Sequence, residues 1–145
     1  MSRPAAQTDL SRMPPLVRAL GDRARRARHR LTLVLSGSRA WTAAAVQTAT
    51  ASLGRPSSPY RPVWLTDRDI GPLGEGREPA WALVLPLTSG TSLTGSETDL
   101  LVYDAWSGLD ADGLAAATGA LRGGGLFLLL TPPLDAWPDW VDPQA

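Results

Sequence analysis

The chain has 145 residues and no net formal charge at neutral pH, and it contains neither lysine nor cysteine. This length suits a single domain with a real hydrophobic core. The absence of cysteine excludes disulfides and thiolate zinc sites, and the absence of lysine excludes Schiff-base catalysis and the lysine of a phosphate-binding loop. The absence of cysteine also favours a cytoplasmic protein. No apolar run reaches the ~18 residues of a membrane span, so we expect no membrane partner.

The charges are unevenly distributed along the chain. Residues 1–40 contain nine arginines and two acidic residues, whereas residues 91–145 contain one arginine and eight acidic residues. This asymmetry indicates an anionic partner for the first part, or docking between oppositely charged surfaces.

The first elements predicted are a helix and a strand. Residues 1–14 are expected to form a flexible N-terminus. Pro14 and Pro15 open a helix, and the residues expected along its buried side are Leu16, Val17, Leu20, Ala24 and Ala27. The apolar run Leu31–Leu35 then predicts a strand in the centre of a sheet, covered on both faces.

The middle of the chain predicts a second helix and a second strand. Ser38 can cap a helix over Arg39–Leu53, and Val63–Thr66 predicts a strand that ends in the turn Asp67-Arg68-Asp69. A loop is expected at Gly54–Pro62 and another at Gly71–Pro79. The apolar run Trp81–Leu85 fits a strand or a helical turn, and we expect a helix or a loop.

The stretch from Asp99 to Pro133 predicts one complete crossover unit. It consists of a strand at Leu100–Tyr103, a helix over Gly113–Leu121 capped by Asp110 or Asp112, a left-handed helix end at Gly123 and a strand at Leu126–Leu130. Leu114, Thr118 and Leu121 are expected on one face of that helix. Such crossovers are parallel and right-handed, with helices covering the sheet. We therefore predict a single three-layer α/β domain, with a Rossmann-like, mostly parallel sheet of at least four strands and helices on both faces.

The common nucleotide-binding patterns are missing after the first strand. Ser36-Gly37-Ser38-Arg39 lacks the glycines of a dinucleotide-binding turn or of a methyltransferase cofactor loop. Gly123-Gly124-Gly125 precedes a strand, which places it at the end of the sheet opposite the usual ligand crevice. His29 is the single histidine and precedes the first strand, so we do not expect catalysis by it. With one histidine and no cysteine only carboxylates remain as metal ligands, and because they lack the spacing of a calcium loop we expect no metal site.

Two groups of residues are candidates for binding. The carboxyl edge of a parallel sheet is where such folds bind ligands, and the candidates there are Ser36, Gly37, Asp104 and Trp106. The second group is a run of basic residues that could contact RNA phosphates: Arg23, Arg25, Arg26, Arg28 and Arg30. A solvated helix end is the alternative explanation of that run.

Several segments, taken in order, resemble one family. They are Arg30–Gly37 with Trp41, Leu93–Asp99, Tyr103–Ala105 with Gly108–Asp110, Gly119–Gly125, Leu128–Pro133 and Trp137–Pro143. Their order resembles the N-terminal domain of the bacterial tRNA(Met) cytidine acetyltransferases over roughly residues 15–143, with a poor match between Gly54 and Leu87. The glycine-rich stretch is also similar to the eukaryotic RNA cytidine acetyltransferases.

The resemblance implies acetylation at N4 of the wobble cytidine of elongator tRNA(Met), with acetyl-CoA and with ATP or GTP and Mg. In that family a helicase-like module and a GNAT-type module carry these activities, and both follow the N-terminal domain. We therefore expect residues 15–134 to be the N-terminal domain and 135–145 to be an acidic exit segment leading to the helicase-like module. The chain would be an excised or truncated piece that is inactive and without a cofactor by itself. It would pack against the helicase-like module and contact tRNA.

One alternative of a different class stays open. The chain could be a stand-alone Rossmann-like binder of small molecules, or a methyltransferase-like enzyme, that uses the crevice near Gly37 and Asp104.

Overall fold

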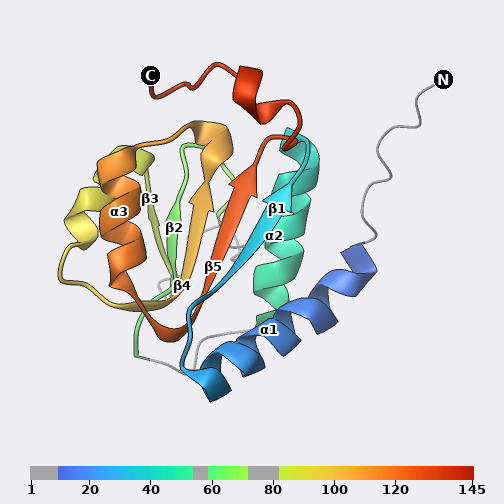
Figure 1. The fold of residues 1–145 in the computed structure, drawn as a ribbon, viewed down its shortest axis with the longest axis vertical. Coiled ribbons are helices and arrows are strands. Elements are labelled where there is room, and N and C mark those ends of the chain that lie inside the picture. The colour runs from blue at the N-terminus through green and yellow to red at the C-terminus, as the bar shows by residue number, and fades with distance from the viewer. Residues whose placement is uncertain (1–9, 54–58, 72–81) are drawn as a thin grey trace.

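The computed structural model describes residues 10–53, 59–71 and 82–145. In these residues five strands form one entirely parallel sheet in the order β1-β5-β4-β2-β3 (Figure 1). The strands are β1 Leu31–Ser36, β2 Val63–Leu65, β3 Leu83–Leu85, β4 Thr98–Asp104 and β5 Leu121–Thr131. The helices are α1 Met13–Ala27, α2 Arg39–Leu53 and α3 Ala111–Ala120, with short 3-10 turns η1 Leu10–Arg12, η2 Leu87–Leu93, η3 Ala105–Ser107 and η4 Trp137–Asp139. The predicted α/β fold is confirmed.

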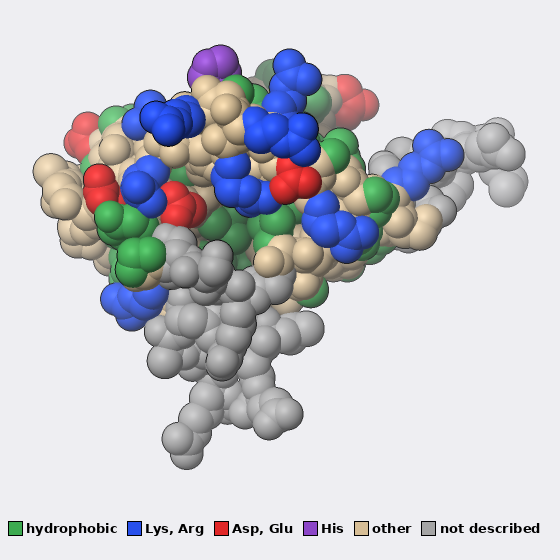
Figure 2. All heavy atoms as spheres, turned by 90° about the horizontal axis from the view of Figure 1, so that it is seen from below, with side chains coloured by type: hydrophobic (Ala, Val, Ile, Leu, Met, Phe, Trp, Pro, Cys, Tyr) green, Lys and Arg blue, Asp and Glu red, His purple; other side chains and the backbone are tan. Residues whose placement is uncertain are grey.

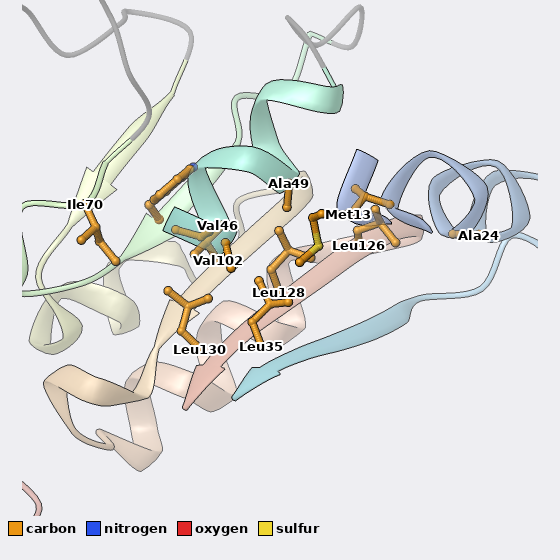
Figure 3. Close-up of a cluster of buried hydrophobic side chains, with 13 residues drawn as sticks. Met13, Ala24, Leu35, Val46, Ala49, Ile70, Val102, Leu126, Leu128 and Leu130 are labelled. Carbon is orange, nitrogen blue, oxygen red and sulfur yellow. The ribbon is translucent and has the colours of Figure 1, made fainter. Parts of the chain in front are cut away.

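The sheet separates two hydrophobic cores, which makes the three layers. Helices α1 and α2 cover one face, where Val46, Leu128 and Leu130 pack together (Figure 3). Helix α3 and the turn η2 cover the other face, where Leu101, Tyr103 and Ala117 are fully buried. Each fully buried large apolar side chain contributes about 1.5–3 kcal/mol, so these two layers supply the main stabilisation of the domain.

The crossover unit is present, but its second strand is longer than predicted. β5 begins at Leu121 and includes the glycine triplet, so Gly123 is not the left-handed end of a helix. Gly124 has the left-handed backbone instead, with φ +92°. Its N–H donates to the carbonyl of His29 at 3.0 Å, and a Cβ added to Gly123 would lie 2.9 Å from the carbonyl oxygen of Arg28. The triplet therefore lets the basic end of α1 lie directly against β5.

Two predictions about strands were wrong. β1 lies at the edge of the sheet and pairs with β5 alone, and alternate residues such as Val34, 44% exposed, face solvent. The apolar continuity of the run was therefore not a sign of burial on both faces. Leu83–Leu85 is a strand rather than a helix or loop, because it pairs in parallel with β2. Residue 81, and residues 54–58 and 72–79 of the expected loops, lie outside the described residues.

For the helices, the predicted residue ranges agree with the structure better than the predicted buried faces do. α2 has the predicted bounds, and the Trp41 N–H donates to the capping Ser38 hydroxyl at 3.0 Å. α1 buries Met13, Val17, Gly21 and Ala24, whereas Leu16 and Ala27 on the expected buried side are exposed.

The third helix also differs in detail. α3 begins at Ala111, two residues earlier than expected, with Asp110 at its N-cap position but without a capping bond from that side chain. Its buried positions are the small residues Gly113, Ala117 and Ala120. Small residues on this face let α3 approach η2 closely, since a Cβ added to Gly113 would lie 2.8 Å from the carbonyl oxygen of Leu87.

Candidate functional site

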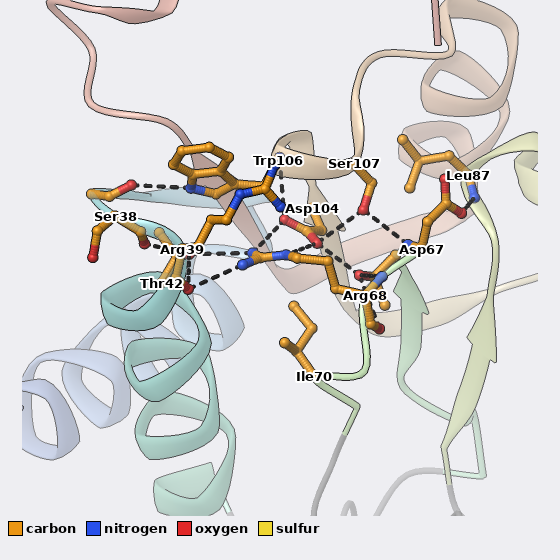
Figure 4. Close-up of polar contacts among 12 residues, drawn as sticks. Ser38, Arg39, Thr42, Asp67, Arg68, Ile70, Leu87, Asp104, Trp106 and Ser107 are labelled. Atoms are coloured by element: carbon orange, nitrogen blue, oxygen red, sulfur yellow. Dashed lines mark hydrogen bonds and ion pairs between the residues drawn. The ribbon is translucent and has the colours of Figure 1, made fainter. Parts of the chain in front are cut away.

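Asp104 ends β4 at the carboxyl edge of the sheet, and its side chain is fully buried. Arg68, just after the neighbouring strand β2, donates to both of its carboxylate oxygens at 2.7 Å (Figure 4). Three further groups donate hydrogen bonds to the Asp104 carboxylate. They are the Thr66 hydroxyl at 2.7 Å, the Ser107 hydroxyl at 3.1 Å and the backbone N–H of Trp106 at 3.2 Å. Both oxygens of Asp104 are therefore engaged by donors of the protein itself.

The same network reaches the helix on the other side of Arg68. The Arg68 guanidinium also donates to the carbonyl of Arg39 at 3.0 Å and to the Thr42 hydroxyl at 3.2 Å, both in the first turn of α2. Arg68 thus joins the ends of β2 and β4 to the start of α2. A bidentate arginine–carboxylate pair of this kind is directional as well as strong, so it sets the geometry of this edge.

Trp106 covers the turn after β1. Its indole N–H donates to the Gly37 carbonyl at 3.0 Å, and the Arg39 guanidinium lies 4.8 Å from the ring centre. The Ser36 hydroxyl donates to the carbonyl of Pro132 at 3.0 Å. The structure therefore brings the predicted crevice residues Gly37, Asp104 and Trp106 together, with Trp106 placed over the turn.

The last residues of the chain lie across the same edge of the sheet (Figure 1). Trp140 meets Trp106 edge to face with ring centres 5.7 Å apart. Asp142 accepts from the Leu109 N–H at 3.1 Å, and the Gln144 amide donates to Asp67 at 2.8 Å and to the Ser107 carbonyl at 2.9 Å. The region where this fold class usually holds its ligand is thus occupied in large part by the protein's own side chains.

Sequence reasoning missed the central role of Arg68. The turn Asp67-Arg68-Asp69 was identified as the end of a strand, but it was not connected with Asp104. The signal was present, because the polar residues that follow neighbouring parallel strands meet at one edge of the sheet. What the sequence did not show was that β2 and β4 are neighbours.

The second candidate group lies at the opposite end of the molecule, on the last turns of α1 and the residues after it. Its five arginines, at positions 23, 25, 26, 28 and 30, are all exposed residues. Arg25 forms an ion pair with Asp22, and the Arg30 side chain donates to the Leu121 carbonyl. A shallow hollow beside the helix is lined by residues that include Leu20, Arg23 and Arg26. The run is therefore an accessible basic surface.

The described residues contain neither a cluster of metal ligands nor a membrane helix. Within 10–53, 59–71 and 82–145, histidine, aspartate and glutamate side chains do not gather in groups of three or more that could hold a metal ion. In the same ranges, none of the helices has the length and apolar character needed to cross a membrane.

Comparison with known proteins identifies the family. Residues 12–145 match the family described as tRNA(Met) cytidine acetyltransferase TmcA, N-terminal. The chain belongs to this family. The tRNA(Met) cytidine acetyltransferase of Nitrosococcus halophilus is 42% identical over 117 residues, which are 80% of this chain and 14% of that protein. The enzyme of the same name from Salmonella typhimurium is 32% identical over 108 residues, or 74% of this chain and 14% of that protein.

Other relatives of the same name match over shorter stretches. The Haloferax volcanii protein is 48% identical over 48 residues, which are 33% of this chain and 6% of that protein. The chain therefore spans a small part, 14%, of the length of the bacterial TmcA proteins that it matches over most of its own length.

Proposed function

We propose that this chain is the non-catalytic, RNA-contacting N-terminal module of a tRNA(Met) cytidine acetyltransferase. The observation that carries the proposal is the row of exposed arginines at the end of α1, in a chain whose relatives are named as tRNA-modifying enzymes. Arginines of this kind bind phosphates through charge and through paired hydrogen bonds, without reading sequence. Elongator tRNA(Met) is the RNA that we propose for this surface.

The chemistry of the enzyme would then belong to other modules. Acetyl-CoA, and ATP or GTP with Mg, would bind to the GNAT-type and helicase-like modules of the same polypeptide in the cytoplasm. The acidic segment after β5 would connect to the helicase-like module and help to pack it. In support, the described polar groups at the carboxyl edge of this domain bind one another, as Asp104 and Arg68 do.

The backbone at Arg28 supports a role for the arginine run. Arg28 ends α1 in the left-handed conformation, with φ +53°, where glycine is the favoured residue. A residue with a side chain is less stable in this conformation, and such positions are concentrated at functional sites. The presence of an arginine at this unfavourable position is therefore explained if its charge contributes to binding.

The alternative, a small-molecule site near Gly37 and Asp104, has less support. A ligand would need to displace Arg68 from Asp104 and Trp106 from the Gly37 carbonyl before it could bind there. Thermal-shift measurements with nucleotides, CoA and S-adenosylmethionine test this alternative. A specific shift that is lost in Asp104→Asn, which keeps the shape of the side chain, while that variant still folds would favour this alternative over the RNA-contacting module.

The test of the proposal compares two pairs of arginines. Arg23→Gln with Arg26→Gln removes two charges from the proposed surface, and Arg12→Gln with Arg18→Gln removes two from η1 and the first half of α1. We expect the first variant to bind tRNA(Met) more weakly and to lower the slope of log affinity against log salt by about 1 for each phosphate that the chain no longer neutralises. Binding of tRNA by the first variant as strong as that by the unaltered chain would remove α1 from the proposal.

A further inference from the structure

The amino-terminal edge of the sheet continues the surface that begins at the end of α1. The Arg30 side chain donates to the Leu121 carbonyl at the start of β5, and Leu121 pairs with Thr98 at the start of β4. The Thr98 hydroxyl in turn donates to the Arg61 carbonyl at 2.8 Å, just before β2. The end of α1 and the starts of three neighbouring strands therefore lie side by side.

This edge carries positive charge beyond the run on α1. Arg61 is exposed, and the Arg122 side chain is 40% exposed. Figure 2 looks at the molecule from this side and shows arginine side chains spread over the face, with acidic side chains between some of them. Two segments far apart in the chain, around Arg28 and Arg122, meet here through the hydrogen bond from Gly124 to His29.

Within this surface, Tyr60 and Arg122 form a stacked pair. The Arg122 guanidinium lies 4.3 Å from the centre of the Tyr60 ring. Arg122 is held on one side by an ion pair with Asp99 at 3.3 Å, and the Tyr60 hydroxyl is hydrogen-bonded to Glu97. Both side chains of the pair are thus held by a neighbour, so they lose less conformational entropy when a ligand stacks on them.

The neighbouring carboxylates indicate what this pair can bind. Glu97 and Asp99 repel a phosphate group at this position, whereas they do not repel the neutral face of a nucleobase. Aromatic rings and arginine planes are the groups on which unpaired bases stack, next to basic residues that follow the backbone. The base faces of a duplex are covered by their neighbours, so a duplex cannot use such a site.

We propose that the amino-terminal edge of the sheet is a binding surface for single-stranded RNA, in which Tyr60 and Arg122 stack on an unpaired base and the arginines of α1 hold the phosphates. This inference rests on the proposed function for its phosphate contacts and adds to it a base-stacking site and a preference for unpaired RNA.

The test compares single-stranded RNA with duplex RNA of the same number of phosphates, each measured by fluorescence anisotropy with the 145-residue chain. Tyr60→Leu keeps apolar bulk and removes the ring, and we expect it to weaken single-strand binding by about five-fold or more, as for the loss of one stacked base. Duplex binding should change by less than about two-fold on the same principle. Tyr60→Phe keeps the ring but loses the hydrogen bond to Glu97, and it should retain most of the single-strand binding that Tyr60→Leu loses.

Arg122→Gln is the second variant, for the case that Tyr60→Leu does not fold. It removes a side chain that is 40% exposed together with its charge, so we expect weaker binding of both RNAs and a larger loss for the single strand than for the duplex. Unchanged single-strand binding in a folded variant, or an equal loss for single strand and duplex, would overturn the stacking site.

The outcomes for the two proposals are separable. If Arg23→Gln with Arg26→Gln weakens binding of both RNAs and Tyr60→Leu has no selective effect, the proposed function stays in place and this inference is overturned. A selective effect at Tyr60 without any effect of the α1 arginines would keep the stacking site and remove α1 from the proposed function. The absence of RNA binding by the unaltered chain would overturn both.

Discussion

Arg68 and Asp104 form a bidentate ion pair that connects the ends of two neighbouring strands, with both Arg68–Asp104 hydrogen bonds at 2.7 Å. The Asp104 side chain is fully buried and that of Arg68 is 14% exposed. Three further donors, on Thr66, Ser107 and the Trp106 backbone, complete the shell of the carboxylate. A buried pair so fully hydrogen-bonded fixes one arrangement of the loops at the carboxyl edge, since other arrangements would leave a charge without partners.

Replacing Asp104 should therefore destabilise the domain strongly. Asp104→Ala leaves the Arg68 guanidinium largely buried without its counter-charge, which typically costs about 3–5 kcal/mol. Urea denaturation measures this loss, and Asp135→Ala, at an exposed position, is the matched control with an expected change within about 0.5 kcal/mol. A similar small effect for both variants would show that the ion pair does not hold this edge together.

Two glycines on either side of the helix–strand junction should respond in opposite directions to alanine. Gly124 has φ +92°, so Gly124→Ala places a side chain in a left-handed conformation and should destabilise by about 1–2 kcal/mol. Gly119 lies on the exposed side of α3, and an added methyl group would meet open space there, so Gly119→Ala should stabilise by about 0.5–1 kcal/mol. Chemical denaturation of the two variants side by side checks both signs, and a loss of stability in Gly119→Ala would contradict the account of α3.

The sequence predicts this fold well where local signals agree with the tertiary structure. The bounds of α2 follow from an alanine-rich run and its Ser38 cap, and the unit from β4 to β5 follows from its two apolar runs and the glycines between them. These signals depend on neighbours in the chain, which the sequence displays directly.

The errors concern relations between distant segments. Leu31–Leu35 is as apolar as a central strand, but its place at the edge depends on β5 and β4 lying between it and β2. The importance of Arg68 depends on the same strand order, since β2 must be next to β4 before Arg68 can meet Asp104. The stacked pair of Tyr60 and Arg122 likewise joins residues that have no sequence relation. Hydrophobic periodicity carries no information on strand order, so these features required the structure.

Tyr103 should make stability fall at alkaline pH. Its ring is fully buried and burial raises its pKa above the ordinary value of 10.0, although its hydroxyl accepts a hydrogen bond from the Asp110 N–H at 2.9 Å. Because the folded-state pKa is the higher one, the stabilisation is complete below pH 10 and is lost as the pH rises through the folded-state pKa. Unfolding free energies of the unaltered chain and of Tyr103→Phe, measured from pH 8 to pH 11, should differ in slope above pH 10, with the steeper decline in the unaltered chain. Parallel curves would show that Tyr103 titrates alike in both states.

Arg28 should show a conflict between stability and RNA binding. Arg28→Gly places the favoured residue in the left-handed position at the end of α1, with φ +53°, and should stabilise the domain by about 1 kcal/mol while it removes one charge from the proposed surface. Arg26→Gly removes one charge as well, but it puts glycine inside the helix and should destabilise by about 1 kcal/mol. Thermal unfolding and the salt dependence of tRNA(Met) binding, measured on both variants, separate the two effects. We expect opposite changes in stability and the same direction of change in affinity. Full affinity in the stabilised Arg28→Gly variant would mean that the unfavourable backbone at Arg28 has no role in RNA contact.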